Sequence, residues 1–172
     1  MNLAIDIGNT KIKAGIFSGG ALLANLSGPF VDADVFIKKI LAGNKIENII
    51  LSSVVNHSDE LFALLASNYN FVYLSNTTKL PFKNKYATPE TLGNDRLSSI
   101  AGAYAAYHGQ NVLVIDAGTC IKCDFISEAG EYLGGSISPG IQMRYNALHT
   151  FTQKLPNLNP VENQPSLIGD TT

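Results

Sequence analysis

The pattern of apolar and polar positions predicts a chain that alternates between strands and helices. Short apolar runs separated by glycine-containing turns are typical of successive strands, and the chain begins with three of them, at residues 3–7, 11–18 and 21–27. Residues 32–41 then carry apolar side chains at helical spacing, and Asp32 is placed to cap that helix. A run rich in β-branched residues at 46–55 predicts a strand with both faces covered.

The middle of the chain continues this alternation and then becomes irregular. We expect a helix at 58–68 and a strand at 71–74. Residues 75–90 contain prolines and lysines without clear periodicity, which predicts a long functional loop. A helix beginning near residue 94 and ending at about 108 follows this loop.

From residue 112 the pattern starts again, and this repeat is the most informative feature of the sequence. Residues 113–119 match residues 3–9 at an offset of 110 (113 − 3 = 110). The same offset aligns the next strand, 121–127, with 11–17. Both copies consist of a strand, an Asp-x-Gly turn, a strand, a glycine turn and a strand. Since register is kept across two turns, we interpret the repeat as an internal duplication.

A duplication also predicts the length of the protein. The first copy occupies residues 1–110 as an N-terminal domain, and a second copy of the same size would extend well past Thr172. The sequence ends after three more strands and a helix near 143–150. We therefore expect residues 111–172 to be the first part of a C-terminal domain whose remainder is missing.

Composition narrows the class of protein. Lys and Arg total 12 and Asp and Glu total 14, so the net charge is −2 and there is no cationic cluster for nucleic acid or an anionic membrane. Charged residues make up 15% of the chain and apolar residues 45%, which excludes disorder and favours a well-buried or oligomeric protein. No apolar run reaches the roughly 18 residues of a membrane span, and no signal peptide begins the chain. We expect a cytoplasmic protein.

The two Asp-Gly turns carry the candidate chemistry. Gly8 and Gly118 would let backbone amides approach an anion closely, and Asp6 and Asp116 at strand ends could hold a cation that offsets phosphate charge. Further donors are Asn9, Thr10 and Thr119. A single such turn is explained as well by an aspartate that caps its own backbone, but the pair favours a phosphate site. The P-loop and dinucleotide-binding glycine motifs are both absent.

Several motifs together resemble a known family. Asp6-Ile7-Gly8-Asn9-Thr10 and Asp116-Ala117-Gly118-Thr119 look like the phosphate-binding turns of the actin, sugar-kinase and heat-shock-ATPase superfamily. The discriminating segments are Gly93-Asn94-Asp95-Arg96, Gly134-Gly135-Ser136-Ile137-Ser138-Pro139-Gly140, and Ala147-Leu148 followed by Leu155-Pro156. In that order they resemble type III pantothenate kinase over essentially the whole chain. The resemblance implies an α/β, duplicated ribonuclease-H-like fold with mixed sheets, and ATP and Mg²⁺ bound between its two domains.

The resemblance also implies the reaction, which is ATP-dependent phosphorylation of pantothenate to 4′-phosphopantothenate, the first step of coenzyme A biosynthesis. Asp95 would be the catalytic base that takes the proton from the primary hydroxyl of pantothenate. The implied ATP-binding residues are Asp6, Gly8, Asn9, Thr10, Lys13 and Thr119, with Asp6 also near Mg²⁺. The implied pantothenate-binding residues are Tyr86, Gly93, Asn94, Asp95, Arg96 and Thr172, the last reaching across the interface of a homodimer.

Two further sites follow from the same resemblance. Asp116 would bind a monovalent cation, K⁺ or NH₄⁺, and Gly135 with Pro139-Gly140 would form a loop beside the nucleotide. The family pattern after the second turn is A-x-T-x-D, and this chain instead has Cys120-Ile121-Lys122-Cys123-Asp124. Lys122 in place of a small hydroxyl residue could alter the nucleotide or cation site, or could supply the positive charge itself.

Without the resemblance, some of these residues have simpler interpretations. The helix dipole favours a carboxylate in a first helical turn, which alone would explain Asp95, with Asn94 as the cap. Arg96 could bind a substrate carboxylate through two hydrogen bonds. Lys13 on a strand could simply face solvent.

The two cysteines do not form a recognisable site. Cys120 and Cys123 lie three residues apart in an expected strand, so their side chains point to opposite faces and cannot easily pair. A zinc site would need two more ligands, and the three histidines have no ligand spacing.

The sequence leaves two other functions open. One is another small-molecule kinase of the superfamily, and the other is a non-catalytic nucleotide-binding regulatory protein on the same fold. The intact Asp6, Asp95 and Asp116 favour catalysis, whereas Lys122 leaves room for the regulatory interpretation.

Overall fold

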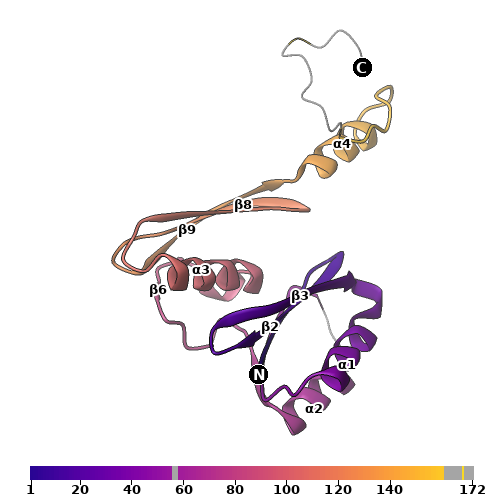
Figure 1. Cartoon of the computed structure of the whole chain (residues 1–172). Helices are drawn as coiled ribbons and strands as arrows, with labels where there is room; N and C mark the ends of the chain where they lie inside the picture. Colours follow the sequence, from indigo (N-terminus) through magenta and orange to yellow (C-terminus); the bar gives the residue numbers. More distant parts are fainter. Residues whose placement is uncertain (56–57, 161–167, 169–172) are drawn as a thin grey trace. The chain divides into compact units, whose positions relative to one another are not determined.

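The computed structural model describes residues 1–55, 58–160 and 168, and its contacts divide the chain into two compact units. Unit 1 comprises residues 1–81 and 86–101, and unit 2 comprises residues 82–85 and 102–172. Each unit is built around its own mixed sheet (Figure 1). The domain division after residue 110 was derived from the sequence repeat, and it stays a prediction.

The sheet of unit 1 has five strands in the order β3-β2-β1-β4-β5. Their bounds are Asn2–Ile7 for β1, Lys11–Ser18 for β2, Ala21–Pro29 for β3, Asn48–Ser53 for β4 and Asn70–Tyr73 for β5. The first three strands form an antiparallel meander, and β4 and β5 run parallel to β1. This order and direction of strands confirm the ribonuclease-H-like prediction for unit 1.

Two helices cover one face of this sheet, α1 (Ala33–Gly43) and α2 (Asp59–Asn68) (Figure 1). Alternate side chains of β1 point toward them and form the core together with residues of both helices. These core side chains are Leu3, Ile5, Ile7, Ile37, Ile40, Leu61 and Leu65. Burying each of them contributes about 1.5–3 kcal/mol, which fixes the sheet that carries the candidate site.

Both helices begin where the sequence predicts, but only α2 has a side-chain cap. Asp32 occupies the capping position of α1 as predicted, yet its side chain makes no capping hydrogen bond. At α2 the Ser58 hydroxyl accepts a hydrogen bond from the amide of Leu61 at 3.1 Å. Such a cap contributes about 1 kcal/mol to helix stability.

The sheet of unit 2 has four strands in the order β6-β9-β8-β7. Their bounds are Lys83–Asn84 for β6, Val112–Ala117 for β7, Cys120–Ile126 for β8 and Glu131–Pro139 for β9. The last three form an antiparallel meander like that of unit 1, and α4 (Ile141–Thr150) leads away from the end of β9 (Figure 1).

The short strand β6 corrects the prediction of an irregular loop over residues 75–90. The amides of Lys83 and Lys85 donate to the carbonyls of Gly130 and Tyr132 at 2.8 and 2.9 Å. Beside them, the buried Phe82 ring lies within 6.4 Å of the Tyr132 ring, centroid to centroid. A strand of two residues has no periodicity of its own, so it is set by these long-range contacts alone.

The two meanders confirm the duplication in detail. Both contain a register shift at the same place, between Ile16 and Phe17 in β2 and between Phe125 and Ile126 in β8. The residue left out of the ladder on the third strand is Leu23 in one meander and Leu133 in the other, an offset of 133 − 23 = 110.

The predicted constant offset is wrong for the second strand of the repeat. Asp6 pairs with Lys13 across β1 and β2, and Asp116 pairs with Lys122 across β7 and β8, which gives an offset of 122 − 13 = 109. The reason is the first turn, which takes residues 8–11 in unit 1 but only 118–120 in unit 2. Lys122 is therefore the structural counterpart of Lys13.

Within the described residues, no helix is both long enough and apolar enough to pass through a membrane.

Candidate active site

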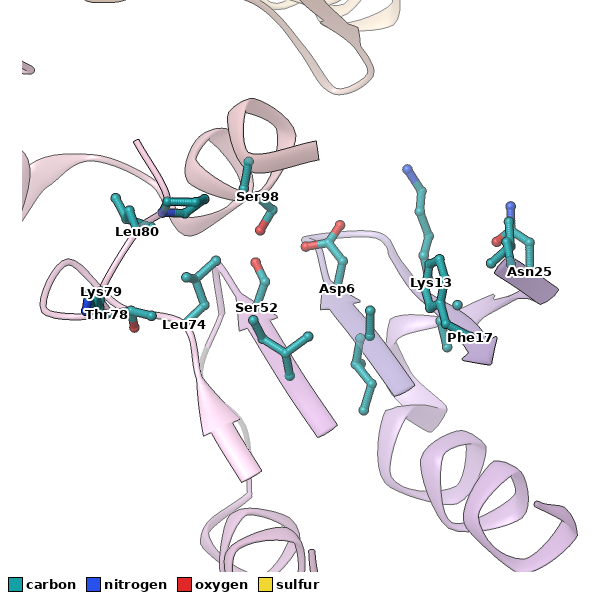
Figure 2. A pocket seen from close by; sticks show the side chains of 18 residues that line it. Asp6, Lys13, Phe17, Asn25, Ser52, Leu74, Thr78, Lys79, Leu80 and Ser98 are labelled. Carbon is teal, nitrogen blue, oxygen red and sulfur yellow. The ribbon is translucent and has the colours of Figure 1, made fainter. Parts of the chain in front are cut away.

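The ends of two parallel strands and the start of a helix meet at one edge of the unit 1 sheet. Asp6 near the end of β1, Ser52 near the end of β4 and Ser98 on α3 (Asn94–Ala106) line a common cavity of about 500 Å³. Figure 2 shows these three side chains pointing toward the same space. The carboxyl ends of parallel strands are the usual place for ligands in open α/β sheets.

Two polar atoms at this edge are buried, Oδ1 of Asp6 and Oγ of Ser52. The Ser52 hydroxyl makes no hydrogen bond within the described part of the chain. A buried hydroxyl without a partner costs about 1–3 kcal/mol, and such a group in a native fold calls for an explanation such as a bound molecule. The edge is therefore suited to a polar ligand or a hydrated cation.

The first turn of α3 makes a hydrogen bond to the end of β4 at this edge. The helix begins at Asn94, and the carbonyl of Gly93 accepts hydrogen bonds from the amides of Arg96 and Leu97 at 3.1 and 3.2 Å. Gly93 thus holds the capping position that the sequence had assigned to Asn94. The Asn94 side chain instead donates to the carbonyl of Ser53 at the end of β4, at 3.4 Å.

The position of the Asp95 carboxylate explains why residue 93 is glycine. Asp95 is partly exposed, and its Oδ1 accepts a hydrogen bond from the Arg96 amide at 2.9 Å. A Cβ atom added at Gly93 would lie 2.5 Å from the same Oδ1. A side chain at residue 93 would displace this carboxylate, so the glycine of the Gly-Asn-Asp-Arg motif keeps the carboxylate in its place.

Arg96 and Tyr86 form the next part of the site. Arg96 is 8% exposed, and its guanidinium carbon lies 5.3 Å from the centroid of the Tyr86 ring. Its Nη1 atom is 3.5 Å from the Tyr86 hydroxyl. A nearly buried guanidinium beside an aromatic ring can recognise a carboxylate through two parallel hydrogen bonds.

Five of the six predicted pantothenate-binding residues are brought together in unit 1. These are Tyr86, Gly93, Asn94, Asp95 and Arg96. A second cavity of about 370 Å³ lies beside them, lined in part by Ser53, Asn76 and Glu90 together with Gly93 and Asn94. The sixth residue, Thr172, lies outside the described residues.

The turn after β1 differs in one respect from the phosphate cradle expected from the sequence. The Gly8 amide donates to the carbonyl of Lys11 at 3.0 Å and so closes the turn itself. Donors for an anion must therefore come from Asn9 and Thr10, both of which are exposed. Lys13 is also exposed, and Figure 2 shows its side chain extended, with the ammonium group apart from the Asp6 carboxylate.

Two glycines of the Gly-Gly-Ser-Ile-Ser-Pro-Gly motif lie close to the backbone of β8 and of the corresponding turn in unit 2. The Gly140 amide donates to the carbonyl of Thr119 at 2.9 Å, and a Cβ atom at Gly140 would collide with the Gly118 carbonyl. A Cβ atom added at Gly135 would likewise collide with the carbonyl of Cys123 on β8. Close backbone approach therefore explains both glycines, and their contact with a nucleotide remains a prediction.

Asp116 and Lys122 form an ion pair across β7 and β8. The Nζ atom of Lys122 lies 2.6 Å from Oδ2 of Asp116. The Lys122 side chain is 13% exposed and that of Asp116 is 42% exposed. The carboxylate assigned to a monovalent cation thus already has a protein ammonium group against it.

One buried polar pair in unit 2 was not singled out by the sequence. The Tyr132 hydroxyl donates to Oδ1 of Asp124 at 2.6 Å, with Tyr132 0% and Asp124 3% exposed. The last aspartate of the A-x-T-x-D pattern was the available signal for Asp124. Its partner is set by the pairing of β8 with β9.

Tyr132→Phe is expected to lower the free energy of unfolding by about 1–3 kcal/mol, because it removes a hydrogen bond from a buried carboxylate. Urea unfolding would measure the loss, with Tyr107→Phe as the matched control on an exposed tyrosine. Equal stability of the two variants would show that the Asp124 contact contributes nothing.

The residues that could hold a divalent metal are few. In the described ranges no group of three or more His, Cys, Asp and Glu side chains could hold a metal ion. Mg²⁺ in kinases is bound by one or two carboxylates together with substrate phosphates, so Asp6 beside Ser52 fits this requirement. Cys120 and Cys123 are both free thiols.

Comparison with known proteins gives a consistent result. A family model described as type III pantothenate kinase matches residues 2–172. The type III pantothenate kinase of Christiangramia forsetii is 45% identical over 181 residues, which cover 100% of this chain and 71% of that protein. That of Flavobacterium johnsoniae is 42% identical over 175 residues, covering 100% and 70%.

A solved structure was also found, described as a conserved putative Baf family transcriptional activator from Campylobacter jejuni. It has a TM-score of 0.49 and 26% identity, and the match covers 87% of this chain and 59% of that chain. The present chain spans about 70% of the length of the curated relatives named above. From the family match and these identities, the chain belongs to the type III pantothenate kinase family.

Proposed function

We propose that this protein transfers the γ-phosphoryl group of ATP to the primary hydroxyl of pantothenate, forming 4′-phosphopantothenate for coenzyme A biosynthesis. The observation that carries the proposal is the start of α3. There Gly93 makes room for the Asp95 carboxylate, and Arg96 is nearly buried beside Tyr86. These are a base and a carboxylate-binding group, the two functions that a hydroxy acid substrate requires.

Asp95 is the residue that acts on the acceptor. Its Oδ1 accepts a hydrogen bond from the Arg96 amide at 2.9 Å, which orients the carboxylate that would accept the proton of a substrate hydroxyl. Phosphoryl transfer depends mainly on positioning and charge stabilisation, so this base needs a fixed place more than an unusual pKa.

Arg96 is the group for the substrate carboxylate. A guanidinium can bind a carboxylate through two parallel hydrogen bonds, and that of Arg96 lies over the Tyr86 ring. If Arg96 bound the substrate carboxylate, it would set the position of the hydroxyl-bearing end of the substrate relative to Asp95. Asn94 supports this arrangement by attaching the helix start to β4.

Residues at the first turn serve the phosphate donor. Asp6 would hold Mg²⁺ with the phosphates, and that ion offsets their charge when it is bound. Asn9, Thr10 and Lys13 are exposed and offer hydrogen bonds and positive charge to the phosphates. Gly8 keeps the turn closed. Thr119 is proposed as a further ATP contact from the family resemblance.

Arg96→Lys is expected to raise the KM for pantothenate about 10- to 100-fold with a smaller change in kcat, because lysine cannot bind a carboxylate through a planar pair of donors. Initial-rate kinetics with varied pantothenate would measure this. Lys39→Arg, at an exposed lysine of α1 outside the candidate site, serves as the charge-conserving control. A KM unchanged in Arg96→Lys would remove Arg96 from substrate recognition.

A panel of acceptors tests the proposed substrate. Pantothenate, pantetheine, glycerol and a simple hexose would be compared at equal concentration with ATP and Mg²⁺. The proposal predicts transfer to pantothenate, weaker transfer to pantetheine, which lacks the carboxylate, and none to the sugar. Preference for the hexose would instead indicate another small-molecule kinase of the superfamily.

Three remaining features are proposed from the family resemblance. The protein is a homodimer in the cytoplasm, and Thr172 reaches pantothenate across the dimer interface. The resemblance also implies a monovalent cation at Asp116, and the ion pair of that carboxylate with Lys122 argues against it.

A further inference from the structure

Asp116 and Lys122 repeat an arrangement that is present in unit 1. In each meander the lysine stands directly opposite the aspartate that lies near the end of the first strand, Lys13 opposite Asp6 and Lys122 opposite Asp116. Directly opposed residues of antiparallel strands have side chains on the same face and within reach of each other. The shorter turn of unit 2 brings Lys122 into this position.

The two lysines nevertheless differ in what they do. Lys13 is exposed and extends away from Asp6 (Figure 2), whereas Lys122 is 13% exposed and holds Oδ2 of Asp116 at 2.6 Å. A charge-assisted contact of this length is among the stronger polar interactions in proteins. Lys122 is therefore committed to Asp116, and Lys13 is available to a ligand.

A separate monovalent cation does not fit beside this pair. A cation bound to Oδ2 of Asp116 would lie directly beside the Lys122 ammonium, and like charges that close repel each other. The ammonium group already carries the single positive charge that K⁺ or NH₄⁺ would supply. The residues present therefore disagree with the cation that the family resemblance implies.

We propose that Lys122 is a built-in monovalent cation at Asp116, so that phosphoryl transfer by this protein requires no K⁺ or NH₄⁺. The inference rests on the proposed kinase function, because it concerns the charge beside the second phosphate-binding turn. Asp116 lies two residues before Gly118, at the start of the turn that carries Thr119. A fixed ammonium there supplies positive charge without an ion-binding step.

The first test compares rates of 4′-phosphopantothenate formation in potassium chloride and in choline chloride at an equal ionic strength of about 0.1 M. The native protein is expected to show the same rate in both salts within about twofold. Lys122→Met, which keeps the side-chain length and removes the charge, is expected to be about tenfold slower in choline and to recover in potassium. Activation of the native protein by potassium of about tenfold or more would overturn the inference.

Lys83→Met provides the matched control. Lys83 also faces an acidic residue in unit 2, with its Nζ 3.9 Å from Oε1 of Glu131, but its side chain is mostly exposed. This variant should behave like the native protein in both salts. A Lys122→Met variant that is equally active in choline and in potassium would also contradict the inference.

The second test measures cation binding without turnover. Thallium(I), a probe for potassium sites, is titrated and followed by its NMR line width. Native protein should not bind it, Lys122→Met should, and adding Asp116→Asn to Lys122→Met should abolish that binding. Thallium binding by the native protein, or its absence in Lys122→Met, would overturn the inference even if the variant were inactive in every salt.

The two tests separate the inference from the proposed function. If the native protein made no 4′-phosphopantothenate in either salt, the kinase proposal would fail, and the thallium measurement would still decide whether Lys122 excludes a cation from Asp116. If the native protein were active only with potassium, the kinase proposal would stand and the inference would fail.

Discussion

Asp95→Asn is expected to lower kcat by a factor of about 10²–10⁴, the usual contribution of a positioned general base. The amide has nearly the same shape as the carboxylate and can keep the contact with the Arg96 amide, but it cannot accept the substrate proton. The Kd values for ATP and pantothenate should change by less than about tenfold, because the other groups assigned to binding are untouched. Steady-state kinetics and calorimetric titration would measure the two quantities.

A matched variant separates catalysis from helix stabilisation. Asp59 occupies the first turn of α2, as Asp95 does in α3, and it lies away from the candidate site. If Asp95 only complemented the helix dipole, Asp95→Asn and Asp59→Asn would each cost about 0.3–1 kcal/mol of stability and leave kcat unchanged. A kcat for Asp95→Asn close to that of Asp59→Asn would remove Asp95 from the mechanism.

Gly135→Ala is expected to lower the free energy of unfolding by about 3 kcal/mol or more. The added Cβ would collide with the carbonyl of Cys123 and would lie 2.7 Å from Oδ1 and 2.8 Å from Cα of Asp124. Backbone atoms in a paired strand cannot move aside without breaking the β8–β9 ladder, in which Asp124 is directly opposite Gly135. The same shift would disturb the buried contact between Asp124 and Tyr132.

Thermal and urea unfolding would measure this effect, with Gly102→Ala as the control. A Cβ at Gly102, inside α3, meets nothing within 4 Å, and alanine is favoured over glycine in helices by up to about 1 kcal/mol. The control should therefore be as stable as the native protein or more so. A Gly135→Ala protein of native stability would mean that β9 does not lie this close to β8.

Most elements of the fold could be predicted because the chain marks them locally. The alternation of apolar residues and the Asp-Gly turns define β1, β2, β7 and β8, and their repetition predicted the second meander. The register between strands could not be predicted in the same way. The turn of unit 2 takes residues 118–120, one residue fewer than the turn of unit 1. Its length depends on backbone hydrogen bonds, such as that from the Gly118 amide to the Cys120 carbonyl at 2.9 Å.

Some parts of the candidate site could likewise be predicted from the sequence, and others could not. The Gly-Asn-Asp-Arg motif pointed to Asp95 and Arg96 from the sequence, because the residues are adjacent and match a family pattern. The roles of Ser52 in the cavity and of Gly93 in making room for the carboxylate depend on atoms brought together by folding. The sequence predicted that Lys122 could supply positive charge, but its ion pair with Asp116 follows from the pairing of β7 with β8.

The most direct test of the kinase proposal is to incubate the native protein with ATP, Mg²⁺ and pantothenate and to quantify both products by mass spectrometry. The account predicts 4′-phosphopantothenate and ADP in equal amounts, with no ADP beyond background when pantothenate is omitted. ATP that binds but yields neither product would contradict it and would favour a nucleotide-binding regulatory protein.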